Sequence, residues 1–139
     1  MMSEQDLRLA AAACEARKKA HAPYSRFTVG AALLCENGEI FSASNVENAS
    51  YGATVCAERA AFSHAVHAGH RSFSKIAIAG AKDAEKALRC VPCGICRQVM
   101  AEFCREDFRI IIVNEAEPCL SCVKTLGGLF PSAFDFTSL

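Results

Sequence analysis

Three cysteines and one glutamate have the residue types and the spacing of a catalytic zinc site. Glu58 follows Cys56 by two positions, and Cys93 and Cys96 lie well downstream in the run Pro-Cys-Gly-Ile-Cys. Three thiolate ligands leave one corner of a tetrahedral zinc ion open, which is typical of catalytic sites and not of structural ones. Water at such a corner becomes a nucleophile near neutral pH. A carboxylate that is not a ligand, here Glu58, can then carry protons between this water and a substrate.

The same cysteines leave two other interpretations open, a structural zinc site and a thiol redox pair. Cys-x-x-Cys alone is a weak signal in a chain with nine cysteines, and Cys119 and Cys122 offer a second pair. We expect that second pair to lie in a strand, where residues three apart point to opposite faces. Cys93 and Cys96 instead open an expected helix, where residues three apart share a face. The pattern therefore favours the catalytic zinc site.

Composition and charge restrict the classes of function. A chain of 139 residues is long enough for one core, and we expect a single domain over residues 1–139. Fifteen basic and fifteen acidic residues cancel, so the chain lacks the basic footprint of a protein that binds nucleic acid. We expect no membrane span and no signal peptide, because no apolar run is long enough. Nine cysteines without a secretory signal predict free thiols and a cytoplasmic location.

Apolar periodicity, caps and turn residues predict the elements that must position these side chains. The first helix begins at a capping box formed by Ser3 and Asp6, and Asn37-Gly38 predicts a hairpin turn. The alternation of strands and helices predicts an α/β fold, a three-layer α/β/α sandwich around a mixed sheet of about five strands. The expected helices cover residues 3–20, 54–67 and 93–103, with a short one near the C-terminus, and the expected strands cover 29–35, 40–41, 74–79, 108–113 and 119–124.

Both cysteine motifs then lie near helix N-termini, which suits thiolate ligands. Exposed N–H groups and the helix dipole lower the pKa of a thiol there and offset part of the charge of three thiolates. Arg59 is expected to donate hydrogen bonds to the thiolates, although a surface ion pair is the alternative for a helix arginine. His64 and His67 are not at ligand spacing, so we expect them at the surface or in an interface.

A Glu two residues after the first ligand, followed by Pro-Cys-x-x-Cys, is typical of zinc-dependent nucleobase deaminases. Over nearly its whole length the chain resembles the small homotetrameric cytidine deaminases. The resemblance rests on Ala-Pro-Tyr-Ser-Arg-Phe-Thr-Val-Gly-Ala-Ala at 22–32, Asn-Val-Glu-Asn-Ala-Ser-Tyr-Gly at 45–52, Cys-Ala-Glu-Arg at 56–59, Pro-Cys-Gly-Ile-Cys-Arg-Gln at 92–98 and Phe-Pro-Ser-Ala-Phe at 130–134.

The resemblance implies one zinc ion per chain, held by Cys56, Cys93 and Cys96, with Glu58 as the catalytic proton carrier. It implies the hydrolytic deamination of free cytidine and deoxycytidine to uridine and deoxyuridine in pyrimidine salvage, with release of ammonia. It also implies a homotetramer with shared active sites, in which Tyr51 and Phe134 reach a neighbouring subunit. The substrate-binding residues that it implies are Phe27, Asn45, Glu47, Ala49, Tyr51, Ala57 and Phe134.

Three other functions share part of this pattern. A deaminase of a nucleoside-like antibiotic such as blasticidin S would have both zinc motifs but no reason for the segment at 45–51. A polynucleotide deaminase would need a basic channel and usually a histidine as first ligand. A non-catalytic zinc module would need a fourth protein ligand and would give Glu58 no task.

Overall fold

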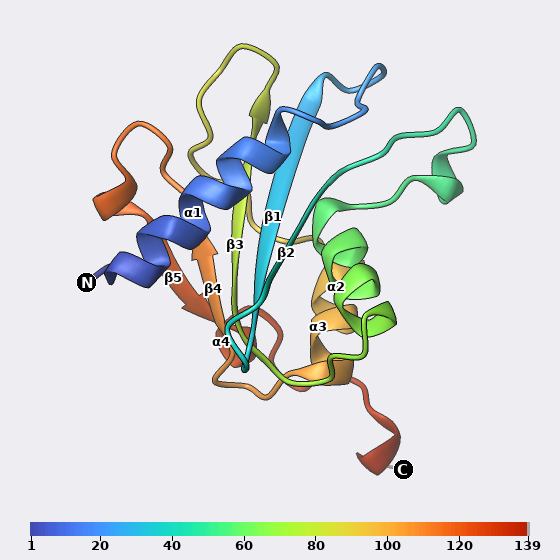
Figure 1. Cartoon of the computed structure of the whole chain (residues 1–139). Helices are drawn as coiled ribbons and strands as arrows, with labels where there is room; N and C mark the ends of the chain where they lie inside the picture. The colour runs from blue at the N-terminus through green and yellow to red at the C-terminus, as the bar shows by residue number, and fades with distance from the viewer. Residues whose placement is uncertain (139) are drawn as a thin grey trace.

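The computed structural model describes residues 1–138 and has one mixed five-stranded sheet between helices. Figure 1 shows α1 on one side of the sheet and the parallel pair α2 and α3 on the other. The three-layer α/β/α architecture predicted from the sequence is thereby confirmed. The α-helices are α1 (Glu4–Arg17), α2 (Ala57–His67), α3 (Gly94–Phe103) and α4 (Leu126–Leu129); the strands are β1 (Phe27–Cys35), β2 (Ile40–Ser44), β3 (Phe73–Lys82), β4 (Arg109–Ile112) and β5 (Cys122–Thr125); short 3₁₀ turns lie at Tyr51–Ala53, Pro118–Leu120 and Phe136–Ser138.

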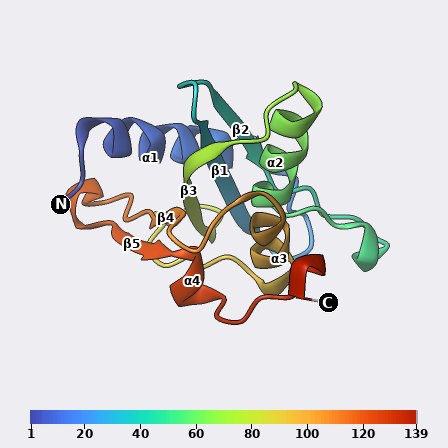
Figure 2. The ribbon, with the colours of Figure 1, turned by 90° about the horizontal axis from the view of Figure 1, so that it is seen from below.

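The strand order β2-β1-β3-β4-β5 combines antiparallel and parallel pairs. β1 is antiparallel to β2 and to β3, β3 is parallel to β4, and β4 is antiparallel to β5. The chain crosses from β3 to the parallel β4 through α3, as parallel neighbours require. This crossover brings the segment that carries Cys93 and Cys96 to the same side of the sheet as α2, as the view from below also shows (Figure 2).

Both faces of the central strands are apolar, which explains why helices cover both. Successive side chains in a strand point to opposite faces. Ala31 and Leu33 of β1 belong to the apolar cluster that includes α2 and α3, whereas Ala32 and Leu34 pack with α1. No helix within residues 1–138 is both long and apolar enough to cross a membrane.

Gly30 lets α1 approach β1 closely. A Cβ atom at Gly30 would lie 2.0 Å from the carbonyl oxygen of Ala13 and 2.4 Å from the backbone nitrogen of Arg17. Real Cβ atoms are never that close to backbone, so no side chain fits at this position. The end of α1 is therefore seated directly on the sheet.

Arg17, at that end of α1, fixes the loop that leads from β3 towards the zinc motif. Its buried guanidinium donates to the carbonyl oxygens of Lys82 at 2.8 Å and Glu85 at 2.7 Å, and it pairs with Glu115 at 3.1 Å. Glu115 also accepts a hydrogen bond of 2.7 Å from the backbone of Ala87. A single charged cluster thus ties residues 82–87 to the body of the fold.

Several expected element boundaries are wrong by a few residues, each for a local reason. The capping box of Ser3 and Asp6 is confirmed, but α1 ends at Arg17 and not at 20. α2 begins at Ala57 and not at 54, because Val55 is paired with Val46 in an isolated bridge.

The strand expected at 119–124 is correct only in its second half. Pro118 opens a 3₁₀ turn that includes Cys119, and β5 begins at Cys122. Proline has a fixed φ and no N–H group to offer to a neighbouring strand, so it delays the strand. Cys119 and Cys122 therefore do not share a strand, so the alternation of strand faces does not determine where their side chains point. Both are exposed free thiols.

Candidate active site

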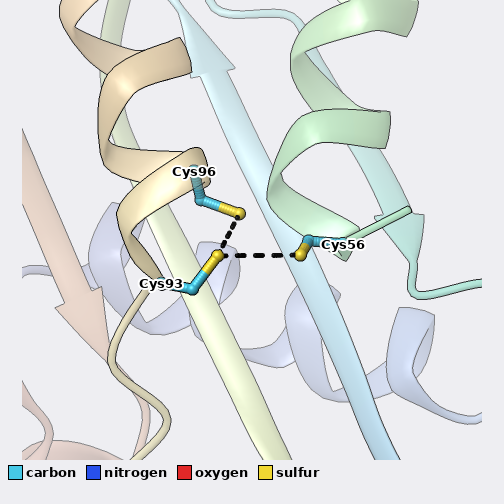
Figure 3. Close-up of side chains that lie close together, drawn as sticks. All are labelled: Cys56, Cys93 and Cys96. Carbon is cyan, nitrogen blue, oxygen red and sulfur yellow. Dashed lines mark hydrogen bonds between the residues drawn. The ribbon is translucent and has the colours of Figure 1, made fainter. Parts of the chain in front are cut away.

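The three predicted ligand thiols come together at the paired N-termini of α2 and α3. Cys56 is the N-cap residue of α2, Cys93 is the N-cap residue of α3, and Cys96 lies in the first turn of α3. Their sulfur atoms all lie within 4.8 Å of one another, with Cys93 at 3.9 Å from Cys56 and at 3.5 Å from Cys96 (Figure 3). Sulfurs at about 2.3 Å from one tetrahedral zinc would be about 3.8 Å apart, so the cluster has the dimensions of a zinc site.

Chain geometry explains why these residues meet. An N-cap residue has extended backbone and leaves its side chain free to turn back over the helix end, and neither cysteine uses its sulfur to cap. Residues three apart in the first turn point the same way, so Cys96 joins Cys93 from one helix. Cys56, Cys93 and Cys96 are the one group within the described residues whose His, Cys, Asp or Glu side chains could hold a metal ion together.

Arg59 supplies positive charge to this cluster and lies where the sequence predicted it, beside the thiol of Cys56. Its Nη2 atom lies 4.0 Å from the sulfur of Cys56 and donates to the carbonyl of Thr54 at 2.9 Å. Its buried Nε has no hydrogen-bond partner within residues 1–138. A half-buried guanidinium with a spare donor beside three sulfurs fits a cluster that carries negative charge.

The electrostatics of the free thiols also favour metal binding. A hydrogen bond from Cys96, together with the hydrogen bond and charge of Arg59, lowers the pKa of Cys56 to about 5 against the effect of burial. The pKa of Cys96 is raised instead, because Cys96 serves as the donor to Cys56 and is itself buried. One thiolate therefore exists near neutral pH before any metal arrives, and metal binding releases the remaining thiol protons.

Glu58 is close to the thiols without being one of the clustered ligands. Glu58 lies in the first turn of α2 and is buried, with only 5% of the residue's surface exposed. Burial raises the pKa of Glu58, and the nearby Cys56 raises it further. A buried carboxyl group with a raised pKa next to a metal site can both accept and release a proton near neutral pH.

The segment 45–55, which carries several of the expected nucleoside-binding residues, runs beside the start of β1. Glu47 accepts hydrogen bonds at its Oε1 atom from the backbone of Tyr24 at 3.0 Å and of Ser25 at 3.1 Å. The hydroxyl and backbone of Ser25 lower the pKa of Glu47, so its carboxylate stays ionised. Tyr24, Ser25, Glu47 and Tyr51 line a groove of about 460 Å³ together with Asn48 and Thr54.

Asn45 has a structural task that sequence reasoning missed. Its side-chain oxygen accepts from the backbone of Val29 at 2.8 Å, and its side-chain nitrogen donates to the carbonyl of Phe27 at 2.9 Å. The amide therefore holds the first residues of β1 against the segment 45–55, and it keeps one N–H for a ligand. The ring of Phe27 lies over Gly80 of β3, since a Cβ atom there would come within 3.0 Å of it.

The remaining predicted substrate-binding residues differ in how far they are exposed. The backbone of Ala57 is buried between Cys56 and Glu58, at the cluster itself. Ala49 lies in an exposed bend. Tyr51 is 80% exposed and its ring contacts Tyr24, and Phe134 is 56% exposed with its ring against Phe136.

A mixed sheet, three thiols at two helix N-termini and a buried carboxyl group beside them define a zinc-dependent deaminase. The family model of the cytidine and deoxycytidylate deaminase zinc-binding region matches residues 3–112, and the chain belongs to this family. Zinc is therefore the metal of the thiol cluster.

Individual relatives agree with this assignment. The chain is 47% identical to the cytidine deaminase of Sporosarcina psychrophila, over 91% of this chain and 89% of that one. It superimposes on the crystal structure of cytidine deaminase from Burkholderia pseudomallei with a TM-score of 0.83 and 43% identity, covering 96% of this chain and 100% of that one. The blasticidin-S deaminase of Bacillus cereus is less similar, with 32% identity over 81% of this chain and 83% of its own length.

Proposed function

We propose that this protein deaminates free cytidine and deoxycytidine hydrolytically, forming uridine and deoxyuridine and releasing ammonia. The observation that carries the proposal is the buried carboxyl group of Glu58 beside the three-thiol cluster of Cys56, Cys93 and Cys96. The cytidine deaminases among its relatives, at 43% and 47% identity, support cytidine as the substrate.

Glu58 is the group that moves protons in the proposed reaction. Zinc, when bound to the three thiolates, supplies an acidified water molecule as nucleophile. Glu58 accepts a proton from this water and delivers it to the ring nitrogen next to the amino-bearing carbon. The hydroxide that remains bonds to the amino-bearing carbon. Glu58 then takes the proton of this new hydroxyl group and carries it to the amino group, whose bond to the carbon breaks as ammonia leaves. One carboxyl group suffices because the two transfers follow each other, and its raised pKa suits both directions.

We assign the sugar of the nucleoside to the groove beside Glu47. One carboxylate oxygen of Glu47 is held by the backbone of Tyr24 and Ser25, which leaves the other to accept from the 3′-hydroxyl. The spare N–H of Asn45 would donate to the same sugar. In a polynucleotide the 3′ oxygen carries a phosphate, which the ionised Glu47 would repel. This arrangement supports a free nucleoside as substrate and argues against nucleic acid.

We also propose that the active protein is a homotetramer in which neighbours complete each other's sites. Tyr51 and Phe134 are large and exposed, as expected of groups offered to another subunit. The exposed side chains of Leu88, Val91, Ile95 and Leu120 supply apolar surface for such an assembly.

We further propose a cytoplasmic enzyme of pyrimidine salvage that consists of one catalytic domain. Nine free cysteines require a reducing compartment. Both apolar clusters pack on the two faces of the same sheet, which supports a single folding unit over residues 1–139. Salvage would reuse the uridine that this conversion yields.

The decisive experiment compares the purified zinc-loaded protein with its Glu58→Gln variant. Loss of the ultraviolet absorbance of cytidine reports deamination directly. Glu58→Gln should keep its zinc and lose about four orders of magnitude in kcat, because an amide cannot carry protons. Turnover of the variant within about tenfold of the parent would leave Glu58 without this role.

The same assay separates the alternatives when other substrates replace cytidine. Deoxycytidine should react comparably, whereas deoxycytidylate, blasticidin S and a short single-stranded oligonucleotide should react far more slowly. No turnover of any of these compounds by a protein with one zinc ion per chain would support a non-catalytic zinc module instead.

A further inference from the structure

Arg97 and Gln98, which directly follow the ligand Cys96, join α3 to the C-terminal tail, residues 130–137. The Nε atom of Arg97 donates to the carbonyl of Pro92 at 2.8 Å, and its Nη1 atom donates to the carbonyl of Leu129 at 2.5 Å. The side-chain nitrogen of Gln98 donates to the carbonyl of Phe134 at 3.0 Å. Two consecutive side chains on one helix thus hold the beginning and the middle of the tail.

The contacts of Arg97 connect the metal site with the tail. Pro92 is fully buried and immediately precedes Cys93, the N-cap of α3. Leu129 is the last residue of α4, from which the tail departs. A planar guanidinium can donate in two directions at once, and charge-assisted hydrogen bonds of this length are strong. Arg97 therefore links the backbone that precedes the ligand Cys93 to the base of the tail.

The backbone of the tail between these two anchors is held in an unfavourable conformation. Ser132 has a φ of 57°, in the left-handed region that costs a residue other than glycine free energy. Such a conformation persists only when its surroundings impose it. The anchors at Leu129 and Phe134 lie on either side of Ser132 and supply that constraint.

Gln98 holds the backbone of Phe134 and leaves its ring free. The ring is 56% exposed and touches only Phe136, at 5.7 Å between ring centroids, among the ring contacts of the described residues. A hydrogen bond to the carbonyl holds the backbone of Phe134 without covering its ring. The exposed ring therefore projects from an anchored stretch of backbone.

We propose that Arg97 and Gln98 are positioning residues that couple the metal-binding turn of α3 to the aromatic ring of Phe134. The inference rests on the proposed function, in which this ring stacks on the base in a neighbouring subunit. Gln98 acts on the tail alone, whereas Arg97 acts on the tail and on the backbone before Cys93. The two residues therefore have different expected effects.

The first test replaces Gln98 by Glu, which keeps the shape but turns the donor into an acceptor that repels the carbonyl of Phe134. KM for cytidine should rise about tenfold, the range expected for loss of base stacking, while kcat and zinc content stay unchanged. The double variant with Phe134→Ala should be no worse than Phe134→Ala alone, because both changes remove the same contact. Glu102→Gln, an exposed position on the same helix, is the control and should change nothing.

The second test replaces Arg97 by Ala and by Lys. Arg97→Ala should raise KM and also release zinc to a competing chelator several-fold faster, whereas Gln98→Glu should release it at the parental rate. Lys can reach one carbonyl but not both. Relative to Arg97→Ala, Arg97→Lys should therefore restore either KM or the rate of zinc release, but not both.

Amide hydrogen exchange gives a readout that does not depend on catalysis. Exchange over residues 130–137 should accelerate in both Gln98→Glu and Arg97→Ala and stay unchanged in Glu102→Gln. If the parent does not deaminate cytidine, the proposed function fails while this arm still tests the anchors. Unchanged exchange and unchanged KM in Gln98→Glu would overturn the coupling, as would a fall in kcat and zinc content without a rise in KM.

Discussion

The buried carboxylate of Asp6 provides a quantitative test of the forces that hold α1 on the sheet. Its two oxygens accept hydrogen bonds from Lys75 at 2.6 Å and from Arg109 at 3.3 Å, which joins the first turn of α1 to β3 and β4. Burial opposes ionisation of Asp6, but the hydrogen bond and charge of Lys75 outweigh it and lower the pKa from 3.8 to about 2.

The expected magnitude follows from this pKa. A difference between 3.8 and about 2, at about 1.4 kcal/mol for each pH unit, gives about 2 kcal/mol of stability near neutral pH. Asp6→Asn should cost at least this amount, and up to about 4 kcal/mol, because it also leaves the buried ammonium of Lys75 without a counter-ion. Because the pKa is lowered in the folded state, the contribution is complete above pH 4 to 5 and is lost as the pH falls towards about 2.

Urea unfolding of the parent and of Asp6→Asn between pH 7 and pH 2 measures this effect. The difference between their free energies of unfolding should be constant at neutral pH and should shrink steadily below about pH 5. Taking the difference removes the loss of zinc in acid, which both proteins share. Glu15→Gln breaks the exposed pair of Glu15 and Lys18 and should have no measurable effect. A difference that is independent of pH would refute the argument, because the charge of Asp6 would then not be its source.

Three further predictions follow from single contacts. Gly30→Ala should lower the free energy of unfolding, measured in urea, by about 3 kcal/mol, because its Cβ would meet the backbone of Ala13. Gly52→Ala should be neutral, because a Cβ there meets nothing within 4 Å. Equal effects of the two changes would contradict the packing of α1. Cys93→Ser should lose its zinc by elemental analysis, and retention of one zinc per chain would refute the ligand assignment. Glu47→Gln should raise KM for cytidine about tenfold, the cost of a hydrogen bond to a charged group, at unchanged zinc content; an unchanged KM would remove Glu47 from the sugar site.

The layered fold and the zinc cluster could be predicted because their signals are local. Residues 93 and 96 are neighbours on a helix face whatever the rest of the chain does, and a proline before them marks the helix start. Apolar alternation along β1 and β3 likewise requires cover on both faces. The strand expected at 119–124 shows the limit of local signals, because Pro118 converted half of it into a turn.

The contacts that position the site could not be predicted, because they join residues far apart in the chain. Arg17 and Glu115 meet only after the whole sheet has formed, and neither has a neighbour pattern that differs from a solvated helix or loop residue. The side-chain amide of Asn45, expected to bind a sugar, also accepts from the backbone of Val29 and donates to the backbone of Phe27. A motif indicates which group does the chemistry and does not indicate what holds that group in place.

The dependence of the site on distant contacts has a physical consequence for how the site is built. The three thiols reach the cluster by two routes: Cys56 by the start of α2, and Cys93 and Cys96 by the crossover from β3 to β4. A zinc ion can bind all three only if both routes end at the same place to within a fraction of an ångström. The polar clusters of Arg17 and of Arg97 act on the two ends of the second route, at residues 82–87 and at Pro92. Arg17 and Arg97 are therefore best understood as the residues that hold the crossover in place, so that it delivers two ligands to the helix that carries the third.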